Sequence, residues 1–376
     1  MVKKVILAVT NDISTDQRVN KVARTLHSMG FDVVITGVQR KNSQPFSPKY
    51  AGIRRMRLLF HKKFGFYAEY NLKLFFLLLF SRFDLVVSND LDTLPAAHLA
   101  AWLRRKPLVY DSHEYFCGSP EIISRPLVFR FWKKLEQVLF PKQKHVITVN
   151  DSIAALYETE YGRKPLVIRN LPPYRTPGAC LPADELSLPP HKDIILLQGS
   201  GINIDRGAEE LVMAMHPDHG LKNVLLLIIG SGDVLPALKD LVREHKLGNR
   251  VVFMDKMPYD ELYEYTRYAS IGVSLDKDTN PNYRFSLPNK LFDYIMAGTP
   301  QLASALPEVA GIIKKYNTGV LSTSHQPAHI AECISEMLSK PDKLAAWETN
   351  CHLAAKELCW EKEETKLIEF YAPFCG

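Results

Sequence analysis

The feature that most constrains the fold is an alternation, from end to end, of short apolar runs with amphipathic segments. In the first half the apolar runs are rich in Val, Ile and Leu on both faces: "KVILAVT", "FDVVIT", "FDLVVS", "PLVYD", "HVITV" and "PLVIR". Runs of this kind are typical of parallel strands that helices cover on both sides. The repeated strand–helix units therefore predict a doubly wound α/β domain.

The alternation breaks once, in a proline-rich stretch. Residues 170–192, "NLPPYRTPGACLPADELSLPPHK", contain six prolines and no hydrophobic period, which is typical of a linker. Apolar runs then return as "DIILLQG", "NVLLLIIGSGD", "RVVFMD", "SIGVSLD", "PQLAS" and "TGVL", and a helical stretch follows from about residue 341. In a chain of 376 residues we predict two similar α/β domains, 1–172 and 193–358, on either side of a linker at 173–192.

Composition and charge exclude few classes of protein. The formal net charge of +6 suits an anionic small ligand, an anionic membrane surface or nucleic acid. The run "LFFLLLF" at 74–80 is far shorter than the roughly 20 residues that span a bilayer, and the apolar N-terminus is too short for a signal peptide. Six cysteines without a C-x-x-C pair fit free thiols in a reducing cytoplasm. We therefore expect a cytoplasmic protein, and the lack of G-x-S-x-G, H-E-x-x-H and Walker motifs disfavours serine hydrolases, zinc proteases and P-loop ATPases.

A short helix is predicted in "SLPNKLFDYIMAGTP", and it carries a cation at its own positive end. Pro288 suits the first turn and Gly298 the stop. Lys290 opposes the helix dipole unless an anion such as a diphosphate supplies the counter-charge. The alternative is that Lys290 pairs with Asp293, which we place with Tyr294 on the same face, or that it points to solvent.

Glycine-rich turns follow two predicted strands of the second domain. In "QGSGINIDRGAEELVMAM", Gly199 and Gly201 allow close approach to the backbone, and Arg206 stands at a predicted helix start. "IIGSGD" places Gly230 and Gly232 in a similar turn, whose simpler interpretation is a tight connection between strand and helix. Cations at two helix starts of one domain together favour an anionic ligand.

In the first domain, acidic residues and one histidine follow predicted strands. "YDSHEYF" puts His113 and Glu114 directly after a strand, where a histidine can be a hydrogen-bond donor, a general base or a structural group. The acidic residues of "TNDISTDQRV" and "SNDLDTLP" can instead be helix caps and turn formers: Asp12, Asp16, Asp90 and Asp92. "DKD" at 276–278 matches a D-x-D metal pattern, but so short a pattern recurs by chance, and we predict no metal site.

Together and in this order, the segments resemble the retaining nucleotide-sugar glycosyltransferases of GT-B fold, the group 1 glycosyltransferases. The resemblance runs nearly the full length and rests on "ND-x3-DQRV-x-K", "NDLDTLP", "VYDSHE", "ITV" followed by "VIRNLPP", "QG" with "RG", "GSGD", "YDELYEYTRYASIGVSL", "LPNKLFDYIMAGTP" and "WEKEETKLIEFY". It implies two Rossmann-like doubly wound domains facing a cleft, with the nucleotide-sugar donor in the C-terminal domain and the acceptor against the N-terminal one. It also implies that the last helix, 359–376, crosses back to the first domain.

The same resemblance implies roles for individual residues. Arg206 and Lys290 would offset the charge of the leaving diphosphate, so that no metal or other cofactor is needed. His113 would contact the donor sugar, and Asp293 would hold the ribose hydroxyls. The rest of the donor site would comprise Gly199, Gly201, Gly230, Gly232, Met257, Leu287, Pro288 and Asn289. The acceptor would lie near Asp12, Asp16, Arg18 and Glu114.

One position departs from the family pattern. The family has two glutamates eight positions apart, whereas this chain has Phe285 and Asp293. The donor sugar is therefore left open. Besides a transferase for cell-envelope polysaccharide, lipopolysaccharide or glycolipid, we keep as alternatives a catalytically silent GT-B-like binding protein and, less favoured, a GT-B-fold sugar-nucleotide epimerase.

Two segments of the first domain, 60–83 and 125–145, combine Lys and Arg with large apolar residues, as helices on a membrane surface do. The alternative is that both bury their apolar faces in the domain, and we favour it for the run at 74–80. We expect a sugar or lipid-linked sugar as acceptor and a peripheral contact with the inner face of the membrane, and we expect no nucleic acid partner.

Overall fold

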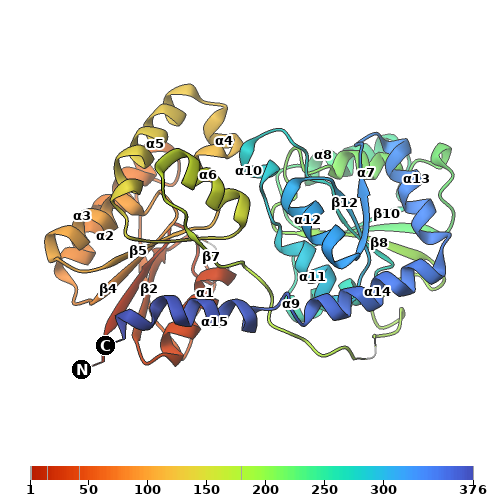
Figure 1. Ribbon diagram of the computed structural model, residues 1–376. Helices are drawn as coiled ribbons and strands as arrows, with labels where there is room; N and C mark the ends of the chain where they lie inside the picture. Colours follow the sequence, from red (N-terminus) through yellow and green to blue (C-terminus); the bar gives the residue numbers. More distant parts are fainter. Residues whose placement is uncertain (1, 15, 42, 179, 376) are drawn as a thin grey trace. The chain divides into compact units, whose positions relative to one another are not determined.

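The computed structural model describes residues 2–14, 16–41, 43–178 and 180–375. The chain forms two compact units, Met1–Asn170 with Lys362–Gly376, and Leu171–Glu361 (Figure 1). Each unit is built on one parallel β-sheet flanked by helices, as the alternation of the sequence predicts.

The first unit has seven parallel strands in the order β3-β2-β1-β4-β5-β6-β7. Their bounds are β1 Lys4–Ala8, β2 Asp32–Val38, β3 Gly52–Met56, β4 Leu85–Asn89, β5 Leu108–Ser112, β6 His145–Thr148 and β7 Leu166–Val167. All six predicted runs are strands. The prediction missed β3, because its "GIRRM" carries two arginines and lies at the edge of the sheet.

The helices of the first unit follow the strands in βα units. They are α1 Gln17–Ser28, α2 Lys63–Phe80, α3 Leu94–Arg104, α4 Pro120–Ile123, α5 Pro126–Leu139 and α6 Asp151–Tyr161. Asp16 caps α1 as predicted, because its side chain accepts a hydrogen bond from the Val19 N–H at 3.1 Å. In the described part of the chain, no helix is long and apolar enough to cross a membrane.

The C-terminal helix α15, Trp360–Tyr371, belongs mostly to the first unit. It lies beside α1 (Figure 1), where the Thr25 hydroxyl donates to Glu364 at 2.5 Å. Glu363 accepts the Arg169 N–H at 2.9 Å, and Tyr371 is fully buried. The two hydrogen bonds hold α15 against α1 and against the segment that follows β7.

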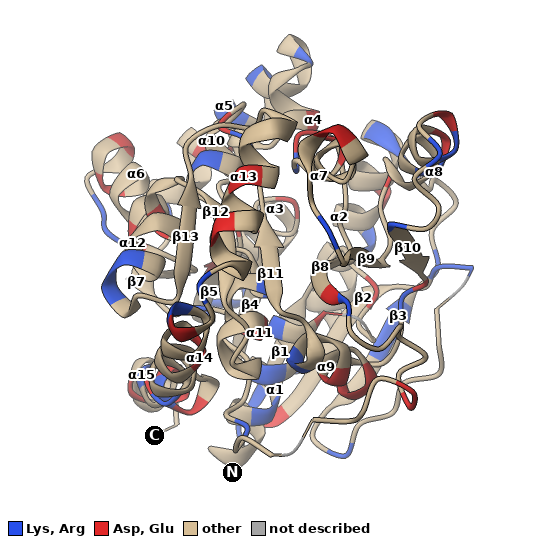
Figure 2. Ribbon diagram, turned by 90° about the vertical axis from the view of Figure 1, so that its right-hand side faces the viewer, with Lys and Arg blue, Asp and Glu red and all other residues tan. Residues whose placement is uncertain are grey.

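The second unit repeats the topology with six parallel strands in the order β10-β9-β8-β11-β12-β13. The strands are β8 Asp193–Gly199, β9 Val224–Gly230, β10 Val251–Met254, β11 Ile271–Ser274, β12 Gln301–Ser304 and β13 Gly319–Ser322. Among these strands, all within the described residues, only Asp193 is charged (Figure 2). Both faces of this sheet can therefore be covered by apolar helix faces.

The helices of the second unit are α7 Ala208–Ala214, α8 Leu235–Glu244, α9 Tyr259–Tyr268, α10 Pro281–Arg284, α11 Asn289–Ala297, α12 Pro307–Tyr316, α13 Pro327–Leu338 and α14 Pro341–Ala355. The proline-rich stretch also packs on this unit. Leu186 and Leu188 are buried in a cluster with Tyr265, whose hydroxyl donates to the Leu186 carbonyl at 3.2 Å. The boundary between the units falls before all six prolines of the stretch, between Asn170 and Leu171.

In both sheets the strand order reverses next to the first strand of the unit, between β1 and β4 and between β8 and β11. Open parallel sheets bind ligands beyond the carboxyl ends of their strands at such a switch point. The residues that follow these four strands are therefore the first place to look for a functional site.

Candidate active site

In the second unit, two cations meet one buried carboxylate at the switch point. Asp276 follows β11 and is buried. Arg206, in the loop after β8, donates from Nη1 to Asp276 Oδ2 at 3.1 Å. Lys290, at the second residue of α11, places its Nζ 3.7 Å from Asp276 Oδ1. One carboxylate thus faces two cations, so the cluster has an excess of positive charge.

The surroundings of this cluster leave its positive charge partly uncompensated. Burial and the Arg206 guanidinium lower the pKa of Lys290, and Asp276 only partly opposes them. The Arg206 guanidinium lies 4.5 Å from the centre of the Tyr283 ring, and its buried Nε has no hydrogen-bond partner within the described residues. Because Lys290 is also in the first turn of α11, the free N–H groups there add to the attraction for an anion.

The glycines of the two turns beside this cluster let backbone pack on backbone. A Cβ on Gly230 would lie 1.8 Å from the Gly199 carbonyl oxygen, and one on Gly232 would lie 1.9 Å from the Ile202 carbonyl oxygen. The Ser231 N–H donates to the Gly199 carbonyl at 3.0 Å, which joins the turns after β8 and β9. Gly230 and Gly232 are therefore required by the fold. This agrees with the simpler interpretation of "IIGSGD" as a tight connection between strand and helix.

Gly230→Ala is expected to destabilise the protein by roughly 1–3 kcal/mol, because neither backbone can move without disturbing the other turn. Urea unfolding of the variant measures this loss. Gly201→Ala is the matched control, since a Cβ there would meet nothing closer than the Asn203 Nδ2 at 3.9 Å. Equal stability of the two variants would contradict the backbone contact as the reason for Gly230.

The structure corrects the predicted face of α11. The Tyr294 ring is fully buried, and its hydroxyl donates to the Leu196 and Val273 carbonyls at 3.0 and 3.2 Å. Tyr294 therefore packs in the core and does not share a face with Lys290 and Asp293. The Lys290 side chain is 11% exposed and faces Asp276. It therefore neither pairs with Asp293 nor points to solvent, which were the two alternatives taken from the sequence.

Asp293 lies one turn further along α11 in a polar setting of its own. Its Oδ1 accepts from the Tyr259 hydroxyl at 2.9 Å, and Gln198 Nε2 is 3.5 Å from its Oδ2. Pro288, which was predicted in the first turn, is the N-cap of α11, and Asn289 is the first residue of the helix. The two remaining donor-site predictions, Leu287 and Met257, are partly buried against the apolar clusters of this unit.

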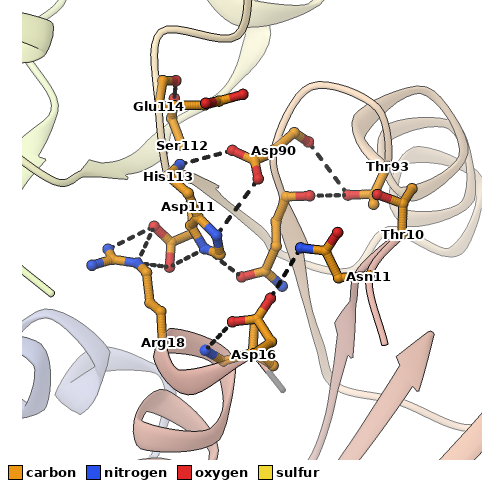
Figure 3. A network of polar contacts seen from close by, with 12 residues as sticks. Thr10, Asn11, Asp16, Arg18, Asp90, Thr93, Asp111, Ser112, His113 and Glu114 are labelled. Carbon is orange, nitrogen blue, oxygen red and sulfur yellow. Dashed lines mark hydrogen bonds and ion pairs between the residues drawn. The ribbon is translucent and has the colours of Figure 1, made fainter. Parts of the chain in front are cut away.

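In the first unit, a polar network occupies the ends of β4 and β5 (Figure 3). Asp90, with a φ of 62°, accepts the His113 N–H at 2.8 Å and places its other oxygen 3.5 Å from the ring Nδ1. The ring Nε2 faces Asn89 Oδ1 at 3.1 Å and Asp111 Oδ2 at 3.4 Å. His113 is thus held by neighbours on both strands.

Arg18, which was predicted on the acceptor side, is held by contacts inside the first unit. It is 3% exposed, and its guanidinium donates to both oxygens of the buried Asp111, with the shortest distance 2.7 Å, and to the Ile168 carbonyl at 2.7 Å. Burial raises the pKa of Asp111, but Arg18 and His113 outweigh it and bring this pKa to about 2. The structure therefore makes Arg18 part of an internal ion pair, which ties α1 to β5 and to the end of β7.

The other predicted residues of this edge have local partners. Asp12 accepts from the Ser14 hydroxyl at 2.8 Å and faces Arg55 at 3.5 Å, and the Glu114 carbonyl accepts from the Ser112 hydroxyl at 2.8 Å. Burial and the charge of Asp90 raise the pKa of Asp92 to about 8, although the Thr10 hydroxyl donates to it at 2.6 Å. Asp12, Asp16 and Glu114 keep their carboxylates at this edge, where they stay candidates for binding a polar substrate.

Sequence reasoning missed the two carboxylates that organise the candidate sites. Asp276 stands out in the sequence only as part of "DKD". In the structure its carboxylate contacts both Arg206, 70 positions earlier, and Lys290. The other member of that pattern, Asp278, pairs with Arg284 at 3.0 Å. Asp111 lies in "YDSHE" at the end of a buried strand, and an acidic residue in so apolar a run is the signal that could have marked it.

The sequence matches two family models that together cover most of the chain. The model described as Glycosyl transferases group 1 matches residues 184–352, and the one described as Glycosyltransferase Family 4 matches residues 17–172. Two Rossmann-like units in one chain define the GT-B class of fold. The chain belongs to the group 1 glycosyltransferase family.

Curated relatives are about a quarter identical to this chain over the residues that align. The D-inositol 3-phosphate glycosyltransferase of Thermobispora bispora is 24% identical over 252 residues, which are 61% of this chain and 57% of the relative. The protein of the same name from Nocardia farcinica is 24% identical over 298 residues, 72% of this chain and 63% of the relative. The chain therefore spans less than two thirds of the length of these relatives.

Solved structures confirm the fold. Sucrose-phosphate synthase from Thermosynechococcus elongatus has a TM-score of 0.80 at 17% identity, covering 99% of this chain and 98% of that one. HepE from Anabaena, solved in complex with UDP and glucose, has a TM-score of 0.77 at 15% identity, covering 99% of this chain and 100% of that one.

Proposed function

We propose that this chain transfers a sugar from a nucleoside diphosphate sugar to an acceptor hydroxyl. The observation that carries the proposal is the pair of cations, Arg206 and Lys290, on the buried carboxylate of Asp276. Membership of the family supports sugar transfer, and the structures of HepE with UDP and with UDP-glucose support a nucleotide-sugar donor.

The two cations suit the charge that develops as the donor reacts. When the bond between the anomeric carbon and the phosphate oxygen breaks, that oxygen gains negative charge. Fixed cations stabilise this charge more in the transition state than in the bound donor, which raises the rate. Because Arg206 and Lys290 share one carboxylate, they supply this stabilisation themselves, and we propose that no metal ion is required.

We assign the ribose of the donor to Asp293. This residue lies one turn beyond Lys290 on α11, and its carboxylate already accepts a hydrogen bond from a hydroxyl, that of Tyr259. An ionised carboxylate accepts about four hydrogen bonds, so it suits the paired hydroxyls of a ribose. We place the acceptor against the first unit, near Asp12, Asp16 and Glu114, whose carboxylates suit the hydroxyls of a sugar for the same reason.

We extend the proposal to retention of the anomeric configuration and to the assembly of cell-envelope polysaccharide, lipopolysaccharide or glycolipid. Family membership supports the first. The second is supported by the fold shared with WaaG, a glycosyltransferase involved in lipopolysaccharide biosynthesis, at a TM-score of 0.74 and 17% identity over 97% of this chain and 99% of that one. Proton NMR of the anomeric centre in the product tests retention.

We also propose a contact with the inner face of the membrane through α2 and α5. Leu74 and Leu78 of α2 and Trp132 of α5 are buried, so each helix packs some of its apolar side chains into the domain. This was the alternative to a membrane contact that the sequence left open. Other large apolar side chains stay outside, among them Phe64, at 70% exposed, and Leu127, at 78%. The α5 sequence adds Arg130 and Lys134, and basic residues beside exposed apolar ones suit an anionic bilayer.

The variant Phe64→Ser/Leu127→Ser is expected to bind phosphatidylglycerol vesicles several-fold more weakly than the wild type, because the apolar contact is lost. Sedimentation with vesicles measures the bound fraction. Leu353→Ser, which removes an apolar side chain of the second unit that is 56% exposed, is the matched control. Equal binding by all three proteins would exclude this surface.

One observation favours a second function, the binding of a nucleotide sugar without turnover. Phe285, the residue that follows α10, stands where the family has a glutamate, and the Arg284 guanidinium lies 5.7 Å from its ring centre. The two functions differ in whether nucleoside diphosphate is released. A phosphate-coupled assay with donor, with and without sugar acceptors, measures that release. Binding without release would favour the silent protein, and an epimerised donor formed without acceptor would favour an epimerase.

A further inference from the structure

The His113 imidazole faces a hydrogen-bond acceptor at each of its two ring nitrogens (Figure 3). At Nε2 the nearest atom is Asn89 Oδ1, at 3.1 Å. The orientation of this amide is fixed, because Asn89 Nδ2 donates to the Ala8 carbonyl at 3.0 Å and only its oxygen is left for the ring. The Nε2 atom therefore has to carry a proton.

A carboxylate reinforces this assignment at Nε2. Asp111 Oδ2 is 3.4 Å from Nε2, and the same carboxylate accepts from Arg18 through both of its oxygens. Its pKa of about 2 keeps Asp111 ionised at neutral pH. An unprotonated Nε2 would face two oxygen lone pairs at once, which is unfavourable in a buried site.

Asp90 faces the other nitrogen and also holds the backbone of the same residue. Its Oδ1 accepts the His113 N–H at 2.8 Å, and its Oδ2 is 3.5 Å from Nδ1. Burial disfavours the charged imidazole, but the charges of Asp90 and Asp111 outweigh it and raise the pKa of His113 to about 9. Arg18, Asp90, Asp92 and Asp111 act electrostatically on the ring, while Asp16 acts on Asp90 and Glu114 acts on Asp92.

We propose that His113 is an imidazolium, protonated at both ring nitrogens, and that Asp90 is the positioning residue that holds it in this state. The ring is 16% exposed, so it can meet a substrate as a fixed positive charge. It cannot act as a general base, because it has no free lone pair. The carboxyl-end edge of the first sheet, which the sequence makes strongly acidic, thus carries a compensating cation. The catalytic part of this inference rests on the proposed function, and the protonation state does not.

The protonation state is measured directly by NMR of the ring nitrogens in the full-length protein, labelled with ¹⁵N and assigned with His113→Gln. At pH 7.5 both nitrogens of His113 are expected to resonate as protonated nitrogens, with the midpoint of the titration near pH 9. One unprotonated nitrogen at pH 7.5 would overturn the proposal. The proton would then lie on Asp90 or be absent.

Asp90→Asn tests the positioning role while keeping the shape of the side chain, and Asn readily adopts the positive φ of this position. Removal of the negative charge is expected to bring the pKa of His113 down to between about 6 and 8. Asp84→Asn, at the opposite end of the sheet, should leave this pKa unchanged. If Asp90→Asn also leaves it unchanged, Asp90 has no positioning role.

The pH profile separates this role from a purely structural one. In wild-type protein the charge of His113 is constant between pH 6 and 8, so kcat/KM should show no inflection from it there. In Asp90→Asn the cation is lost as the pH rises through the lowered pKa, so kcat/KM should fall severalfold over that range. A protein with the expected NMR result but no transfer from any donor would disprove the proposed function alone.

Discussion

Lys290→Ala is expected to lower the rate of nucleoside diphosphate release by about 100- to 1,000-fold, the effect typical of removing one preorganised charge-stabilising group. The reason lies in the shared carboxylate. Without Lys290, Asp276 and Arg206 form a neutral pair, and no excess positive charge is left for the phosphate. The loss should appear in kcat as well as in donor affinity, because the charge on the leaving oxygen grows during the reaction. Initial rates at saturating donor measure it.

Two further variants make this prediction specific. Arg243→Ala removes an exposed cation that pairs with Asp240 on α8, and it should leave the rate unchanged. Arg206→Ala should resemble Lys290→Ala, and the double variant should lose less than the sum of the two free energies, because both cations act through one carboxylate. A Lys290→Ala protein that turns over at the wild-type rate would remove the cation pair from the mechanism.

Arg18→Ala is expected to reduce the free energy of unfolding by about 3–5 kcal/mol, the cost of leaving one partner of a buried ion pair alone. Asp111 is fully buried and would keep its contact with His113 but lose its ion pair with Arg18. The variant also frees the Ile168 carbonyl, which accepts from Arg18 at the end of β7. Urea unfolding followed by near-ultraviolet circular dichroism measures the loss.

The control for Arg18 is an ion pair of the same unit that is open to solvent. Lys106 donates to Asp84 at 2.9 Å, and the two side chains are 34% and 41% exposed. Lys106→Ala should therefore cost less than about 1 kcal/mol. If Arg18→Ala costs no more than this control while acceptor binding is lost, Arg18 belongs to the acceptor site as the family resemblance implies, and its burial is incidental.

Much of the fold could be predicted because buried parallel strands leave an unambiguous signal. Twelve apolar runs in the sequence correspond to β1, β2 and β4–β13. The strand β3 escaped because an edge strand tolerates Arg54 and Arg55. The proline-rich stretch was predicted as a linker, but prolines suit a packed irregular segment equally well, and Leu171, Leu186 and Leu188 of this stretch are buried.

A residue of the candidate site could be predicted only where its neighbours in the sequence make it unusual. A cation in the first turn of a helix is locally unfavourable, so the sequence by itself distinguishes Lys290. It does not distinguish the partner Asp276, because the contact joins residues that the fold alone brings together. Arg18 lies at the exposed-looking start of an amphipathic helix, and nothing near it in sequence shows that its partner Asp111 lies 93 positions away. Tyr294 was predicted on the polar face of its helix because it has a hydroxyl. The hydroxyl donates to backbone carbonyls inside the core, a contact that the sequence around it does not show.

The most direct test of the central claim is a calorimetric titration of the full-length protein with UDP-, GDP-, dTDP- and CMP-sugars, in buffer with a metal chelator. We expect selective binding of one nucleoside diphosphate sugar by the wild type, and loss of that binding in Lys290→Ala but not in Arg243→Ala. Binding that persists in Lys290→Ala, or a well-folded wild type that binds none of the four donors, would contradict the assignment of a diphosphate to the Arg206–Asp276–Lys290 cluster.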